Sequence, residues 1–135
     1  MDGRDAITAT NVLSLTEAED ITLTTTEGGI WVVKINAGAT GDVTLNSAGA
    51  ITDDGNAGTV LTADVLTADA AGGITLDTNV SSANISTSAA GAIDVDETNA
   101  ITLTDVDTAN GSITVDTGAA ISATAVSWLT AANDI

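Results

Sequence analysis

Five short segments of the chain share one pattern of apolar and polar residues. Each reads apolar, polar, apolar, polar, polar, and their first residues are Ile21, Val43, Ile74, Ile93 and Ile113. Because side chains alternate between the two faces of a β-strand, this pattern is typical of a strand with one buried face. Four of the five segments have a glycine two positions before their first residue, which predicts a corner with a positive φ or a close backbone approach. The sequence therefore predicts short strands that alternate with corners.

The spacing of the five segments predicts how the strands are arranged. Their first residues are 22, 31, 19 and 20 positions apart, and a second motif, at residues 7–12 and 60–65, precedes Ile21 and Ile74 by the same distance. Periods near 20 residues without a helical segment favour an all-β fold, a parallel β-helix or β-solenoid with coils of about 20 residues. We expect one solenoid segment over residues 1–135, in six or seven coils. The wide interval predicts a loop that leaves the rod between Thr52 and Gly58.

A β-sandwich is the alternative fold, because its strands also recur every 8–12 residues. A sandwich seldom repeats one strand five times, and it usually has several core aromatics, whereas Trp31 and Trp128 are the only aromatics here. Helix is expected, if anywhere, only in residues 127–135. Residues 30–35 are apolar on both faces, so Trp31 either lies under a neighbouring domain or subunit or rests on its own coil.

Stacking the five segments in register predicts ladders of like residues. The inward ladder is aliphatic and of nearly constant volume, as a uniform rod requires. Its expected members are Ile21, Leu23, Val43, Leu45, Ile74, Leu76, Ile93, Val95, Ile113 and Val115. The fourth positions form one outward column, which reads Thr24, Asn46, Asp77, Asp96 and Asp116.

Three stacked aspartates, Asp77, Asp96 and Asp116, would repel one another across the strands. Either Ca²⁺ relieves this repulsion, because hard cations choose oxygen ligands, or water and salt screen it. These three aspartates are the candidate calcium ligands, and no other cofactor is expected. The related pattern of Asp94, Asp96 and Asn99 is one residue longer than the start of an EF-hand loop, and we favour the explanation that these Asp and Asn residues shape corners.

Composition excludes several classes of function. The formal net charge is −17, with Arg4 and Lys34 as the only basic residues, which argues against binding to nucleic acid or to an anionic membrane. The chain has no His and no Cys, so thiol catalysis and a His-activated serine are excluded, and we expect no enzyme. Interrupted Thr-x-Thr pairs argue against an ice-binding face. We expect no membrane insertion, because there is no long apolar run, and no signal peptide in this sequence.

Three stretches, residues 7–12, 91–103 and 110–115, resemble the repeat units of filamentous-haemagglutinin-like bacterial surface proteins. The resemblance is one of repeat style and composition, and no functional residue is transferred by it. It implies a right-handed parallel β-helix in a long secreted or cell-surface fibre that serves adhesion. Two functions are therefore expected. One is a structural or adhesive rod segment whose coils stack on further repeats or on other copies of itself, and the other is a calcium-dependent binding or assembly module.

Overall fold

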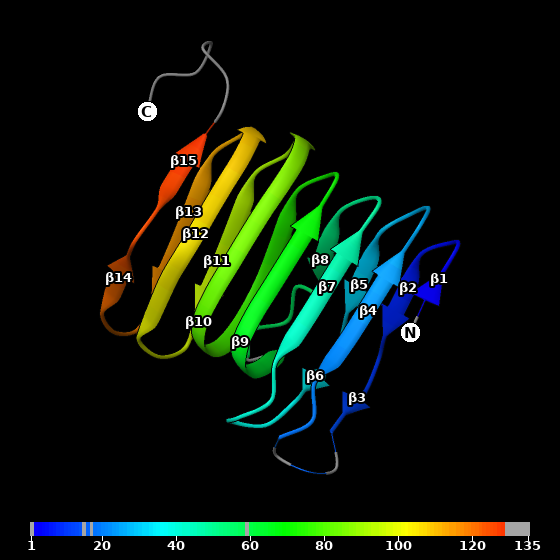
Figure 1. Ribbon diagram of the computed structural model, residues 1–135, viewed down its shortest axis with the longest axis horizontal. Helices are drawn as coiled ribbons and strands as arrows, with labels where there is room; N and C mark the ends of the chain where they lie inside the picture. The colour runs from blue at the N-terminus through cyan, green and yellow to red at the C-terminus, as the bar shows by residue number, and fades with distance from the viewer. Residues whose placement is uncertain (1, 15, 17, 59, 129–135) are drawn as a thin grey trace.

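The computed structural model describes residues 2–14, 16, 18–58 and 60–128, and these form a rod of stacked parallel strands (Figure 1). The chain winds in successive coils, so that β1 and β15 lie at opposite ends of the rod. Every strand pair is parallel, which excludes the sandwich, and no helix occurs among the described residues. The predicted β-solenoid with its short, regular coils is confirmed.

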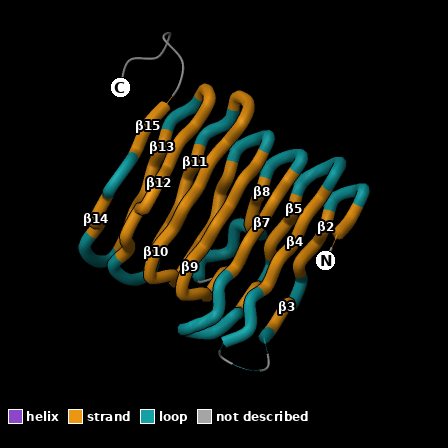
Figure 2. The backbone as a smooth tube through the Cα atoms, in the orientation of Figure 1, coloured by secondary structure: helices purple, strands orange, loops and turns teal. Residues whose placement is uncertain are grey.

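Each coil has three faces, which we name A, B and C. Face A contains the short strands β1 (Asp2–Gly3), β4 (Ile21–Thr25), β7 (Val43–Ser47) and β15 (Val126–Trp128). Three longer strands, β9 (Leu61–Ala70), β10 (Ile74–Ala90) and β12 (Ile101–Asn110), contribute their C-terminal parts to face A. Face B contains β2 (Ile7–Ala9), β5 (Ile30–Val32), β8 (Ile51–Asp53), the first part of β10, β11 (Ile93–Glu97) and β13 (Ile113–Thr117). Face C contains β3 (Val12–Leu13), β6 (Ile35–Asn36), the first half of β9, the middle of β10, the first half of β12 and β14 (Ile121–Ala123). The long strands β9, β10 and β12 pass from one face to the next without a break (Figure 2).

The prediction of one ladder through all five segments is wrong at one step. Val43 does not stack on Ile74; its partner in the next coil is Leu66, and the partner of Ile74 in the preceding coil is Ile51. The segments at Ile21 and Val43 therefore belong to face A, and the three later ones belong to face B. The wide interval between Val43 and Ile74 therefore consists of one full coil, from Val43 to Leu66, and the step from face A to face B, from Leu66 to Ile74.

The repeat that the structure defines on face B is more regular than the predicted one. Isoleucine occupies the same position in six successive coils, at residues 7, 30, 51, 74, 93 and 113. Successive coils are therefore nearly equal in length. These isoleucines and the inward residues of face A make one continuous aliphatic core, in which most members of the predicted ladder are buried. Ile21, Ile113 and Val115 are only partly buried.

Glycines at the corner between faces A and B let successive coils approach each other closely. A Cβ atom on Gly111 would lie 2.2 Å from the carbonyl oxygen of Gly91, and one on Gly91 would lie 2.4 Å from the nitrogen of Gly73. No side chain fits at these distances. The sequence predicted either a positive φ or a close approach at these corners, and the close approach is confirmed. Among the described residues, the glycines with positive φ lie elsewhere, at Gly28, Gly38, Gly55 and Gly58.

A loop follows β8, as the sequence predicts, although it is not the main cause of the long interval. Residues 55–58 are exposed, and a Cβ atom on Gly55 or Gly58 would have no neighbour within 4 Å. Val60, which precedes β9, is buried again. At the other end of the chain, where helix was considered, Val126–Trp128 is strand β15, and residues 129–135 lie outside the described residues.

Candidate functional site

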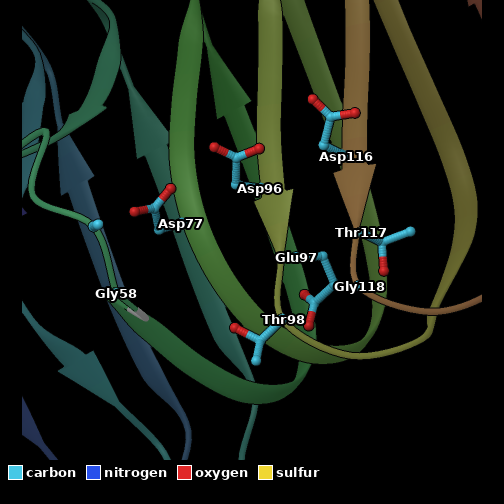
Figure 3. A pocket seen from close by; sticks show the side chains of 9 residues that line it. Gly58, Asp77, Asp96, Glu97, Thr98, Asp116, Thr117 and Gly118 are labelled. Carbon is cyan, nitrogen blue, oxygen red and sulfur yellow. The ribbon is translucent and has the colours of Figure 1, made fainter.

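The three aspartates that the sequence places in one column do lie side by side on face B. Asp77 is the register partner of Asp96, and Asp96 is the partner of Asp116, so that the carboxylates project from three adjacent strands, β10, β11 and β13 (Figure 3). We call these three residues the acidic column. Thr24 and Asn46, which were expected in the same column, instead lie on face A, where the next member is Asp69.

The acidic column forms one wall of an open groove. The loop after β8 contributes Ala57 and Gly58 to the groove, and the corner after β11 and β13 contributes Thr98 and Gly118. The groove has a volume of about 540 Å³. Its lining contains no aromatic side chain for stacking on a sugar ring, and no basic side chain.

The electrostatics of this groove are those of crowded negative charge. Partial burial raises the pKa of Asp77, and the neighbouring carboxylates of Asp53, Asp96, Asp54 and Asp94 raise it further. The two basic residues of the chain lie in the first two coils, whereas the column spans the fourth to the sixth, so no lysine or arginine offsets the repulsion. The groove is therefore a region of concentrated negative charge.

The side chains around the column are already engaged in shaping the backbone. Asp53 accepts hydrogen bonds from the N–H groups of Gly55 at 2.9 Å and Asp77 at 3.0 Å, and Asp54 accepts one from the N–H of Asn56 at 3.1 Å. These bonds hold the loop beside the acidic column. Within the described part of the chain, no group of three or more acidic, His or Cys side chains has an arrangement that could hold a metal ion.

The aspartates of the pattern that resembles an EF-hand do not converge on one point. Asp94 and Asp96 both project outward from β11. Asn99 lies in the corner after β11, and its side-chain amide donates to the side-chain oxygen of Asn79 in the preceding coil at 2.7 Å. Asp105, Asp107 and Asn110 have the same spacing and lie on and beside face A, where burial and the neighbouring Asp105 and Asp69 raise the pKa of Asp107. Asn99 therefore shapes a corner.

The residue that the sequence analysis missed is Glu97, at the end of β11. Only 4% of it is exposed, and its Oε2 accepts hydrogen bonds from the hydroxyl of Thr78 at 2.8 Å and from the N–H of Val80 at 3.1 Å. Its Oε1 accepts a third bond, from the N–H of Asn99 at 3.0 Å. The carboxylate thus joins two coils from inside the rod.

Glu97 occupies a position at which other coils use a hydroxyl group. Thr25, Ser47 and Thr78 are its counterparts on the two faces, and all are buried at the fifth position of the strand. Thr25 and Ser47 donate to the carbonyl oxygens of Gly28 and Ala50, at 3.0 and 3.2 Å. The sequence carries the signal, because strict alternation turns the first, third and fifth positions inward, so that a polar fifth residue is a buried one.

Trp31 lies on the outer side of face B, between Thr8 and Thr52 of the neighbouring coils. It is 52% exposed, so its ring rests partly on its own coils and is not covered by another part of the described chain. The expectation that a neighbouring domain or subunit covers it stays a prediction.

Comparison with protein-family models, with curated proteins and with solved structures found no match. None of the described residues forms a helix that is long and apolar enough to cross a membrane. The fold and the geometry of the acidic groove are therefore the basis for a functional proposal.

Proposed function

We propose that this chain is a structural or adhesive rod segment of a secreted or cell-surface fibre, in which solenoid coils stack end to end. The observation that carries the proposal is the state of the two ends. Among the described residues, β13, β14 and β15 each pair with a strand on one side only, and so do β1, β2 and β3 at the opposite end. Strand edges of this kind favour pairing with a further coil.

The outer faces also support a scaffold role. They carry mainly threonine, serine, asparagine and aspartate, which suit a solvated surface, and the groove offers neither a nucleophile with a base nor an aromatic platform for a sugar ring. The resemblance of the repeats to those of large bacterial surface proteins points in the same direction.

The proposal is tested where the protein occurs naturally. An antibody raised against the folded chain is expected to label fibres or the outer surface of the source cells in immunogold electron microscopy. Labelling that is confined to the cell interior would overturn the proposal. An antibody against the unfolded chain serves as the control for access to the epitope.

The second candidate function is a calcium-dependent assembly module. The observation that favours it is the in-register acidic column, whose crowding raises the pKa of Asp77 and which a divalent cation would relieve. Thermal unfolding with and without Ca²⁺ separates the two candidates, as described in the Discussion.

A further inference from the structure

The C-terminal end of the rod exposes apolar side chains that coils in the middle bury. Ile121 and Val126 are 45% and 44% exposed. Their counterparts one coil inward, Ile101 and Val106, are 2% and 0% exposed, because a further coil covers them. One additional layer at this end would therefore bury aliphatic surface of the same kind that stabilises the rest of the rod.

The backbone groups at the two ends are complementary in direction. On face B, the isoleucine of each coil donates its N–H to the carbonyl oxygen of the residue just before the isoleucine of the next coil. This bond recurs five times, as Ile7 to Gly29 at 3.0 Å, Ile30 to Ala50 at 2.9 Å, Ile51 to Gly73 at 3.0 Å, Ile74 to Ala92 at 2.9 Å and Ile93 to Ser112 at 2.9 Å. Parallel pairing therefore directs the N–H of Ile113 out of the C-terminal end and the carbonyl of Ala6 out of the N-terminal end.

Face C repeats this arrangement. Val12 donates its N–H to the carbonyl of Lys34 at 2.9 Å, and Ile101 donates to that of Ala120 at 3.1 Å. The N–H of Ile121 therefore points out of the C-terminal end, and the carbonyl of Asn11 points out of the opposite end. On both faces the C-terminal end presents donors and the N-terminal end presents acceptors. Ile121 lies eight residues after Ile113, whereas Val12 lies five residues after Ile7, so the register of the junction is the one that face B sets.

We propose that the C-terminal coil of one molecule binds the N-terminal coil of a second copy, with the N–H of Ile113 donating to the carbonyl of Ala6 of that copy. This inference rests on the proposed rod function and names its partner and register. It stacks Ile7 on Ile113 and Ala9 on Val115, and so continues the column of isoleucines across the junction. Because the contact joins unlike ends, it does not close and produces a filament.

Charge favours this pairing over a contact between two like ends. The register places Thr10 of the second copy beside Asp116, so the acidic column stops at the junction. Two C-terminal ends in contact would instead bring two acidic columns together, which like-charge repulsion disfavours. The head-to-tail contact thus satisfies the strand edges without extending the column of carboxylates.

Two proline substitutions test the junction, one at each end. Thr8→Pro removes an N–H that points out of the N-terminal end, and Val115→Pro removes one that points out of the C-terminal end, so neither removes a hydrogen bond within the rod. We expect wild-type protein to form filaments in negative-stain electron microscopy and sedimentation velocity, and each variant alone to stay monomeric. An equimolar mixture of the two variants is expected to form dimers and nothing larger, because it contains one intact end of each kind.

The matched control is Thr8→Ala, which keeps the N–H and is expected to assemble as the wild type does. Circular dichroism and thermal unfolding establish that each variant is folded. Filaments of folded Thr8→Pro, or a mixture that stays monomeric, would overturn the proposed junction. A wild-type chain that stays monomeric at high concentration would also overturn the proposed junction. It would not overturn the proposed rod function, because repeats that are linked covalently would still label as fibres in the immunogold experiment.

Discussion

Replacing Glu97 with alanine should destabilise the rod more than any other single change to a polar side chain that we describe. The substitution removes the acceptor of three hydrogen bonds, and two of the donors, the Thr78 hydroxyl and the Val80 N–H, belong to buried residues. The third donor is the N–H of Asn99, an exposed residue, so water can replace the lost acceptor there. A buried donor that loses its partner costs about 1–3 kcal/mol, so we expect a loss of about 3 kcal/mol in the free energy of unfolding.

The assay is urea unfolding followed by circular dichroism, supported by thermal unfolding. For a chain of this length, a loss of about 3 kcal/mol corresponds to a decrease in Tm of about 10 °C. Glu97→Thr is the matched control, because threonine occupies the same position in the coils on either side, at Thr78 and Thr117. The hydroxyl of Thr117 accepts from the N–H of Ala119 at 3.1 Å, and a threonine in place of Glu97 should accept from Asn99 in the same way.

Such a side chain is too short to reach Val80 as well, so Glu97→Thr should cost about 1–2 kcal/mol, less than the alanine variant. If Glu97→Ala unfolds at the same urea concentration as the wild type, the carboxylate contributes no net stability and the reasoning is refuted. Equal losses in the two variants would mean that side-chain volume, rather than hydrogen bonding, is what the position requires.

Three further predictions concern the corners and the acidic groove. Gly111→Ala should lower the free energy of unfolding by more than about 2 kcal/mol, because the new Cβ would lie 2.2 Å from the Gly91 carbonyl oxygen. Gly55→Ala should lower it by only about 1 kcal/mol, because Gly55 has φ +68° but open space around it. Urea unfolding of both variants measures these losses. The pKa of Asp77 is higher in the folded than in the unfolded chain, so the contribution of this group to stability is fully present below the ordinary pKa of 3.8 and is lost as pH rises through the raised pKa. Asp77→Asn should therefore increase Tm at neutral pH, by the equivalent of about 0.5–1 kcal/mol, and the increase should vanish in acid. An increase in Tm that is the same at all pH values would contradict this explanation. EDTA should leave Tm unchanged if the chain is a plain rod, while an increase in Tm with added Ca²⁺ that Asp96→Asn abolishes would establish the calcium-dependent alternative.

The sequence predicted the class of fold because the physical requirement is simple. A coil of three short strands cannot bury its apolar side alone, and a repeated apolar–polar alternation without helical periodicity leaves stacking as the solution. Burial of Leu45, Leu76 and Val95 follows directly from that alternation. The column of Asp77, Asp96 and Asp116 was predictable for the same reason, because the two intervals between these aspartates each match one coil.

Assignment of segments to faces could not be made from the alternation, because faces A and B both present an aliphatic inner side and a Thr- and Asp-rich outer side. Val43 and Ile74 look equivalent in sequence although they stack on different neighbours. A signal was present in the six isoleucines of face B, whose spacings vary less than those of the five chosen segments. Glu97 was not predictable from residue type, because its carboxylate is tolerated inside only through bonds that the corner of the neighbouring coil supplies.

The pairing of each strand with strands one coil away has a consequence for how the rod folds and opens. All partners on face B are separated by a single coil of chain, and no strand reaches past its immediate neighbours in the stack. Such a chain behaves as a row of coupled units, so folding can begin in any coil and spread in both directions, and opening begins at the ends. Amide hydrogen exchange should therefore be slowest in β9 and β10 and become faster toward β2 and β14, with the rate reporting how many layers separate an amide from the nearer end.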